Sequence, residues 1–319
     1  MTANNLNESP SANISVIVPC FNAGATLGMA INSILNQVDV KVEIVVVDDG
    51  STDNSLAVAR AFEPWIRVIA GPNRGASAAR NRGIAETAAE WVVFLDSDDL
   101  LVHSTLRARL NAVKSAEVDV ILCDWQELID DGSAMDDSAP VKSINVAILA
   151  ENSELACATH FWLPPAAIMY RRALVQKIGG FRTDLPIIQD ARFLFDAACH
   201  GACFAYSEHV GAIYRVHPQS LSRQDSVQFW RDVLLNGTQI EALWRARGSL
   251  TEHEQEALAA IYNNAARGFF AAASPEYFDA VERQHALARP LPCHSRIAAP
   301  LARTIGLSSA RRMLALIGR

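Results

Sequence analysis

The sequence predicts an α/β protein with a mostly parallel sheet flanked by helices, followed by a helical C-terminal region. Over the first hundred residues, short apolar runs rich in β-branched side chains alternate with helix-like stretches. These runs are too apolar for strands with one face in water, which is typical of buried parallel strands. After about residue 225 no strand pattern remains and helical spacing takes over.

The elements of the first hundred residues follow in order along the chain. Leu27, Ile31 and Ile34 repeat at helical spacing and place the first helix between two apolar runs. Successive strand and helix units of this kind form a doubly wound sheet with right-handed crossovers. We expect strands over residues 14–18, 42–47, 66–70 and 91–95, and helices over residues 26–36, 55–62 and 77–88.

The later elements are predicted from composition and capping signals. Residues 127–153 are acidic and indicate a loop-like excursion, whereas residues 229–245 and 252–270 carry helical spacing. The second of these helices opens with Thr251 and Glu254 in a capping-box pattern. We therefore expect a disordered segment over 1–13, an α/β domain over 14–225 and a helical region with a basic tail over 226–319.

Composition limits the function. The 319 residues are 50% hydrophobic and 20% charged, which is typical of a globular protein. A net charge of -7 argues against a nucleic-acid partner. The six cysteines form no CxxC pair, and the polar start, whose first apolar run ends at Pro19, predicts neither a signal peptide nor a spanning helix. We expect a cytoplasmic protein.

Acidic residues follow two of the predicted strands. Asp48 and Asp49 come after the second, and Asp96, Asp98 and Asp99 after the fourth. Because ligands bind beyond the carboxyl ends of such strands, these acids predict a site for a hard divalent cation, Mg²⁺ or Mn²⁺. The alternative is that they are turn or helix-capping residues, an interpretation favoured for Asp53 and Asp99, which we place just before helix starts.

Other motifs are absent from the sequence. There is no G-x-x-x-x-G-K-[ST], no G-x-G-x-x-G after a strand and no G-x-S-x-G. These absences argue against a P-loop NTPase, an ordinary dehydrogenase and a hydrolase with a serine nucleophile elbow.

Four further runs carry a family resemblance: 16–22 (VIVPCFN), 46–53 (VVDDGSTD), 73–83 (NRGASAARNRG) and 94–99 (FLDSDD). In order and spacing they resemble the family 2 glycosyltransferases, and the match continues through Gly179-Gly180-Phe181, Gln189-Asp190 and 214–218 (YRVHP). The resemblance covers about residues 14–222 and implies a GT-A fold. It also implies transfer of a sugar from a nucleotide-diphosphate sugar with inversion at the anomeric carbon.

The resemblance assigns roles to individual residues. It implies that Asp96 and Asp98 form the metal-binding DxD motif, with Asp98 the direct metal contact, and that His217 coordinates the metal or contacts the diphosphate. Asp96 also belongs to the donor site. Residues implied to bind the nucleotide sugar are Pro19, Phe21, Asn22, Asp49, Arg80 and Gly180, with Asp49 accepting a hydrogen bond from the base.

Several of these residues also have plainer interpretations. Arg80 is otherwise a solvated or salt-bridged surface residue, His217 a structural histidine, and the Gly179-Gly180 pair the C-cap of a helix over 172–178. Residues 162–165 (WLPP) line an acceptor groove or belong to the core.

Asp190 is the implied general base, which removes the proton of the acceptor hydroxyl. It matches the final acid of the family's Glu-Asp motif, but Gln189 replaces the Glu, so that an ionic contact is weakened or lost. The alternative is that Asp190 caps a helix that starts at Ala191.

We therefore expect an inverting, metal-dependent enzyme that uses a UDP-sugar and a glycan or lipid-linked acceptor in cell-surface polysaccharide or glycoconjugate synthesis. The alternatives are nucleotidyl transfer to a sugar phosphate, which the loop after the first strand argues against, and a catalytically weak binding or scaffold module. Beyond Glu282 the chain has seven arginines and no acid. This tail either contacts the cytoplasmic membrane face peripherally or folds back onto the acidic body.

Overall fold

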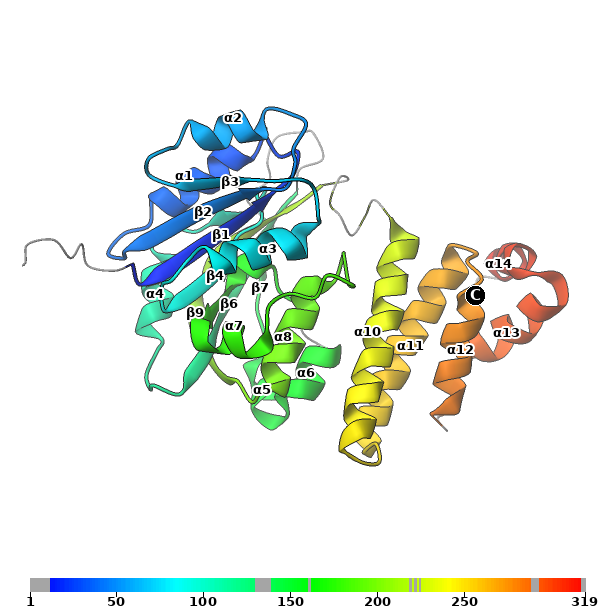
Figure 1. Ribbon diagram of the computed structural model, residues 1–319. Coiled ribbons are helices and arrows are strands. Elements are labelled where there is room, and N and C mark those ends of the chain that lie inside the picture. Colours follow the sequence, from blue (N-terminus) through cyan, green and yellow to red (C-terminus); the bar gives the residue numbers. More distant parts are fainter. Residues whose placement is uncertain are drawn as a thin grey trace, which may run out of the picture. The chain divides into compact units, whose positions relative to one another are not determined.

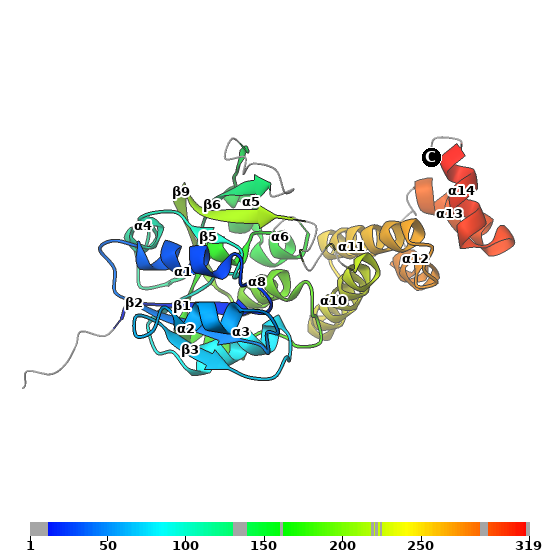
Figure 2. The same ribbon diagram turned by 90° about the horizontal axis from the view of Figure 1, so that it is seen from above.

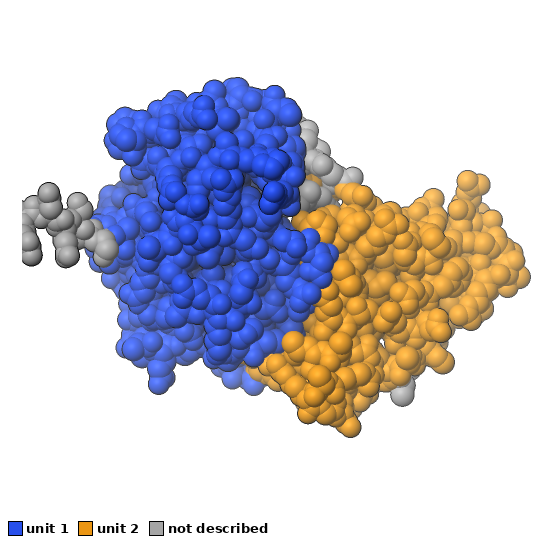
Figure 3. All heavy atoms as spheres, viewed as in Figure 1, with its two compact units in different colours: residues 1–151, 162–184, 189–217 blue, residues 152–161, 185–188, 218–319 orange. Residues whose placement is uncertain are grey.

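A computed structural model describes residues 12–129, 139–159, 162–217, 220, 223, 225–287 and 293–316. The chain forms two compact units, which Figure 3 shows in different colours. The first comprises residues 1–151, 162–184 and 189–217, and the second comprises 152–161, 185–188 and 218–319. The division of the chain at residue 225 stays a prediction.

The first unit contains a mixed, mostly parallel sheet flanked by helices, which confirms the predicted fold class (Figure 1). Its nine strands lie in the order β3-β2-β1-β4-β8-β6-β9-β5, with β7 paired to β6. Strands β3, β2, β1 and β4 are mutually parallel, and β8 joins this group to β6 through antiparallel pairs. The bounds are β1 (Ile14–Cys20), β2 (Val42–Asp48), β3 (Arg67–Ala70), β4 (Trp91–Phe94), β5 (Leu100–Leu101), β6 (Val118–Ile129), β7 (Val141–Lys142), β8 (Ile168–Arg171) and β9 (Cys203–Val216).

The register of the parallel strands brings the motif residues to one edge. Cys20 of β1 pairs with Asp48 of β2, and Ile17 of β1 pairs with Phe94 of β4. Every residue of β1 is buried, as expected for a strand covered on both faces. The polar residues that follow β1, β2 and β4 therefore gather at the carboxyl edge of the sheet.

Helices cover the sheet of the first unit, as the two views show (Figures 1 and 2). Helix α3 packs directly on β1 and β2. A Cβ atom at Gly83 of α3 would lie 2.2 Å from Ile17 Cγ2, so only glycine permits this close approach. The helices are α1 (Leu27–Leu35), α2 (Ser55–Arg60), α3 (Ala76–Ala85), α4 (Thr105–Asn111), α5 (Val146–Glu151), α7 (Arg172–Ile178), α8 (Gln189–Cys199) and the 3₁₀ turn η1 (Pro165–Ala167).

The loop expected over residues 127–153 is wrong in part. Strand β6 runs on to Ile129, and β7 and α5 lie in the same stretch. The acidic residues that indicated a loop fall mostly at 130–138, outside the described residues. Strand β6 is longer than the apolar run suggests, because Gln126, Glu127 and Leu128 pair with β9.

The regular secondary structure described in the second unit consists of helices joined by short turns. Asp225 caps α10 by accepting a hydrogen bond from Gln228 N (2.8 Å). The predicted capping box is confirmed, since Glu254 N donates to Thr251 Oγ1 and Thr251 N donates to Glu254 Oε2. The helices are α6 (Ser153–Thr159), α10 (Ser226–Arg247), α11 (Glu252–Ala271), α12 (Tyr277–Ala286), α13 (Cys293–Ile305) and α14 (Leu307–Leu316). Within the described residues, no helix combines the length and the apolarity needed to cross a membrane.

Candidate active site

The acidic turn after β4 meets the end of β9. Asp98 Oδ2 lies 2.8 Å from His217 Nε2, although 119 residues separate them. Both side chains are partly exposed. Burial raises the pKa of Asp98, and the neighbouring carboxylate of Asp96 raises it further. The structure thus brings together two of the three residues for which the sequence analysis expects metal binding.

Asp99 and Arg215 connect the turn that carries Asp98 to the end of β9. Its Oδ1 accepts a hydrogen bond from Arg215 N (2.8 Å), and Arg215 Nε donates to the carbonyl oxygen of Asp98 (2.9 Å). The interpretation of Asp99 as a residue just before a helix start is wrong, because strand β5 follows it and the next helix begins at Thr105. Since Arg215 is 116 residues away, nothing local in the sequence indicated this contact.

The interpretation of Asp53 as a turn residue at a helix start agrees with its contacts. Its Oδ1 accepts a hydrogen bond from Ser55 N (2.9 Å), the first residue of α2, and its Oδ2 accepts from Gly24 N (3.0 Å). Asp53 thereby ties the loop after β1 to the start of α2.

Asp96 faces a cation. It forms an ion pair with Arg80 of α3, whose side chain is only 2% exposed and lies over the ring of Phe181, with 5.2 Å from the guanidinium carbon to the ring centroid. The interpretation of Arg80 as a surface residue is therefore wrong, because the face of α3 that carries Arg80 is buried. Two further nitrogens, Nε and Nη1, find no hydrogen-bond partner among the described residues.

The side chains that could coordinate a metal ion fit a divalent cation only in part. In the described part of the chain, no group of three or more His, Cys, Asp and Glu side chains converges as a metal site. The Asp98–His217 pair supplies two ligands, while Asp96 is held by Arg80. Mg²⁺ and Mn²⁺ commonly bind one or two protein side chains and complete their coordination with phosphate oxygens and water, and the pair fits that pattern.

Asp190 lies in the first turn of α8. Its Oδ1 accepts a hydrogen bond from Ala191 N (2.8 Å), but the helix already begins at Gln189, so Asp190 is not the residue before the helix as the capping interpretation requires. Burial raises the pKa of Asp190, and the charge of Arg80 opposes this rise. The adjacent Gln189 is buried, and its Oε1 has no partner among the described residues.

The residues implied to frame the nucleotide connect two loops at the sheet edge. Asn22 Oδ1 accepts a hydrogen bond from Thr52 N (2.8 Å) across the β1 and β2 loops. Asp49 binds the loop before α3, because Arg74 N and Gly75 N donate to its two carboxylate oxygens (2.9 and 2.7 Å). Phe21 is exposed beside Asn22, whereas Pro19 is buried inside β1.

The glycine pair after α7 has a structural explanation. Gly179 (φ 88°) ends the helix in the left-handed conformation, as expected for a C-cap. A Cβ atom at Gly180 (φ 95°) would lie 2.6 Å from Asn81 Oδ1. The same Asn81 oxygen accepts a hydrogen bond from Phe181 N (2.7 Å), so Gly180 permits the contact that holds Phe181 beneath Arg80.

An aromatic cluster lies near the acids. Trp162, 43% exposed, makes edge contacts with Tyr214 (5.1 Å between centroids) and Trp125 (6.3 Å). Burial raises the pKa of Tyr214, and the negative charges of Asp99, Asp96, Asp190 and Asp98 raise it further. The sequence assigned no role to Tyr214 within the matched run 214–218, because the environment of this side chain depends on strand pairing across the sheet.

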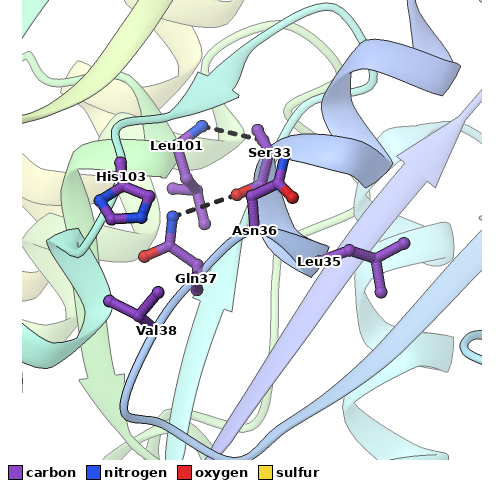
Figure 4. A pocket seen from close by; sticks show the side chains of 7 residues that line it. All are labelled: Ser33, Leu35, Asn36, Gln37, Val38, Leu101 and His103. Atoms are coloured by element: carbon purple, nitrogen blue, oxygen red, sulfur yellow. Dashed lines mark hydrogen bonds between the residues drawn. The ribbon is translucent and has the colours of Figure 1, made fainter.

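The pocket in Figure 4 contains none of these residues. It lies at the C-terminal end of α1, where Gln37 Nε2 donates to Ser33 O (3.1 Å) and Leu101 N donates to Ser33 Oγ (3.1 Å). Its lining consists of Ser33, Leu35, Asn36, Gln37, Val38, Leu101 and His103. We assign it no role in the chemistry.

Comparisons with known proteins identify relatives of this chain. The chain is 31% identical over 218 residues to the succinoglycan biosynthesis protein ExoO of Rhizobium meliloti (strain 1021), covering 66% of this chain and 62% of that protein. It is 28% identical over 222 residues to the uncharacterized glycosyltransferase EpsJ of Bacillus subtilis (strain 168), covering 66% of this chain and 62% of the relative. It thus spans less than two thirds of these relatives.

Solved structures show the GT-A fold. Residues 1–349 of S. aureus TarS in complex with UDP-GlcNAc superpose with a TM-score of 0.68 at 21% identity, covering 96% of this chain and 92% of that one. The mannosyltransferase PcManGT from Pyrobaculum calidifontis, in complex with GDP-Man and Mn²⁺, gives a TM-score of 0.57 at 20% identity, covering 97% and 88%.

The family model described as glycosyl transferase family 2 matches residues 15–179, just over half of the chain. That range contains the loops after β1, β2 and β4, together with α3 and Arg80. The chain therefore belongs to the family 2 glycosyltransferases.

Proposed function

We propose that this enzyme is an inverting, metal-dependent glycosyltransferase that moves a sugar from a UDP-sugar to a hydroxyl of a glycan or lipid-linked acceptor. The acceptor belongs to the synthesis of a cell-surface polysaccharide or glycoconjugate, and the enzyme works in the cytoplasm, where it is peripheral to the membrane. The observation that carries the proposal is the Asp98–His217 contact beside buried Arg80. TarS with bound UDP-GlcNAc and PcManGT with bound GDP-Man and Mn²⁺ support a nucleotide-sugar donor.

The leaving group is stabilised at the Asp98 end of the site. Asp98 and His217 would hold Mg²⁺ or Mn²⁺, and the bound ion would supply positive charge that offsets the charge of the departing diphosphate. Asp96 orients Arg80 through their ion pair and contributes to the donor side of this site. Arg80 is buried and paired with Asp96, so its guanidinium adds a fixed positive charge to the region of the diphosphate.

Asp190 acts as the general base. An inverting displacement needs a carboxylate that takes the acceptor proton while the sugar carbon is attacked from the face opposite the diphosphate. A pKa raised by burial makes Asp190 a stronger base than an exposed aspartate. Trp162, exposed beside Tyr214, would present an aromatic face to the acceptor sugar.

The base and ribose of the donor occupy the loops after β1 and β2. Pro19, Phe21 and Asn22 frame this position, and Gly180 lets the loop after α7 approach the donor sugar. Asp49 uses one lone pair of each oxygen for Arg74 N and Gly75 N. Each oxygen keeps a second lone pair, so Asp49 can still accept a hydrogen bond from the base.

Asp99 is a positioning residue for the Asp98–His217 pair. Asp99→Ala removes the acceptor for Arg215 N and is expected to weaken Mn²⁺ affinity by about tenfold, since a lost buried hydrogen bond costs about 1–3 kcal/mol. Asp99→Asn keeps an acceptor oxygen and is expected to restore most of the affinity. Electron paramagnetic resonance titration of Mn²⁺ measures both variants. Equal affinities for the Ala variant and the unmodified enzyme would contradict this role.

Thermal shift with UDP-, GDP- and dTDP-sugars, each with and without Mn²⁺, tests the proposed function. A UDP-sugar is expected to raise Tm only when Mn²⁺ is present, with stabilisation of about 2.7 kcal/mol at one hundred times Kd. Hydrolysis and transfer assays with the same donors follow. Binding without turnover of any donor would instead identify a nucleotide-sugar-binding module, and a GDP- or dTDP-sugar preference would overturn the choice of UDP.

A further inference from the structure

The two C-terminal helices carry arginine side chains but no Asp or Glu. We call α13 and α14, residues 293–316, the basic hairpin; both are red in Figure 1. No Asp or Glu occurs after Glu282 in the sequence. All four arginines of the hairpin are exposed: Arg296, Arg303, Arg311 and Arg312.

Three of these four arginines, Arg303, Arg311 and Arg312, have no ion-pair partner among the described residues. The Arg303 guanidinium carbon lies 6.0 Å from the ring centroid of Phe278, and Arg311 donates to the carbonyl oxygen of Ala271. Neither these two arginines nor Arg312 has an ion pair with any described carboxylate. The hairpin packs within its own unit through buried Ala302 and Leu314, and the charges of Arg303, Arg311 and Arg312 remain available to a partner.

Apolar side chains are exposed among these cations. Ile305 is 41% exposed, Met313 50% and Leu316 88%. An apolar groove also runs between the two helices, lined by Ile297, Pro300, Leu301, Thr304, Met313 and Leu314. Cations with adjacent exposed apolar groups on short helices are the combination that binds the interface of an anionic bilayer.

We propose that the basic hairpin docks the protein on an anionic lipid leaflet. The arginines attract the lipid headgroups, and Met313 and Leu316 insert beside them. A nucleic-acid backbone could bind the arginines, but the exposed apolar side chains would then have no role. An acidic protein could bind the same arginines without a bilayer. The inference rests on the peripheral membrane contact of the proposed function and assigns that contact to the hairpin, and its test does not require sugar transfer.

Vesicle co-sedimentation of the full chain tests the proposal. We expect binding to vesicles of phosphatidylcholine with about 30% phosphatidylglycerol, weaker binding at high salt and little binding to pure phosphatidylcholine. Replacing Arg303, Arg311 and Arg312 together by Gln is expected to weaken binding by about a hundredfold, at about fivefold for each arginine. The matched control replaces Arg60, Arg107 and Lys114, which are exposed in the first unit, by Gln and should bind as the unmodified protein does.

Two further variants keep the test decisive. Arg303→Lys, Arg311→Lys and Arg312→Lys together retain the charge, and this variant should bind normally. Arg312→Glu alone reverses the charge of one exposed side chain and should still weaken binding if the triple Gln variant fails to fold. Equal binding to charged and neutral vesicles, equal loss in the control, or binding to duplex DNA but not to vesicles would overturn the proposal.

Discussion

Asp98→Ala is expected to abolish metal-dependent donor binding and to lower transfer by about a thousandfold, since a bound cation contributes several kcal/mol at the leaving group. The fold should persist, because Asp98 lies at the rim of the sheet with its carboxylate bound only to His217 among the contacts described for it. Calorimetric titration of the UDP-sugar with and without Mn²⁺, together with a transfer assay, measures the loss.

The matched control for this change is Glu117→Ala, which removes an exposed acid elsewhere in the first unit. It should retain full activity and the same Tm. His217→Ala should weaken Mn²⁺ affinity while leaving the Asp98 carboxylate in place. Full metal-dependent activity in the Asp98→Ala variant would contradict the assignment of Asp98 as a metal ligand, whichever nucleotide sugar is the donor.

Asp190→Asn is expected to lower kcat by about a hundredfold or more, which is the usual loss when a general base is removed. The affinity for the donor should stay nearly unchanged. The amide oxygen of Asn still accepts the hydrogen bond from Ala191 N, so α8 should begin as before. Steady-state kinetics give kcat, and calorimetry gives the donor Kd. An unchanged kcat would place the base elsewhere.

The pH profile provides a second readout for Asp190. Because burial raises the pKa of Asp190, kcat should fall as the pH drops through a value above that of an ordinary aspartate, and the Asn variant should lack this acid limb. A raised folded-state pKa means that the folded protein binds this proton more tightly than the unfolded chain does. The contribution of Asp190 to stability is therefore present at low pH and is lost as the pH rises through its folded pKa, so Asp190→Asn should not be less stable at neutral pH.

The sequence predicted the parallel half of the sheet because its information is local. Each apolar run that forms β1, β2 and β4 is buried on both faces, and hydrophobicity alone indicates such a strand. The capping box at Thr251 and the C-cap at Gly179 were likewise readable, since both depend on residues within one helical turn. Because these runs were predicted to be parallel strands, the polar residues that follow them were also expected to share one edge of the sheet.

Tertiary structure alone decided which of those residues touch. His217 reaches Asp98 only because β9 pairs with β5 and β6, and Asp99 holds Arg215 across the same pairing. Arg80 belongs to an alanine-rich helix whose sequence gives no sign of burial, yet the packing of α3 on β1 and β2 encloses its guanidinium beside Asp96. Contacts over more than a hundred residues depend on strand pairing and helix packing, and neither is encoded in the local periodicity of the chain.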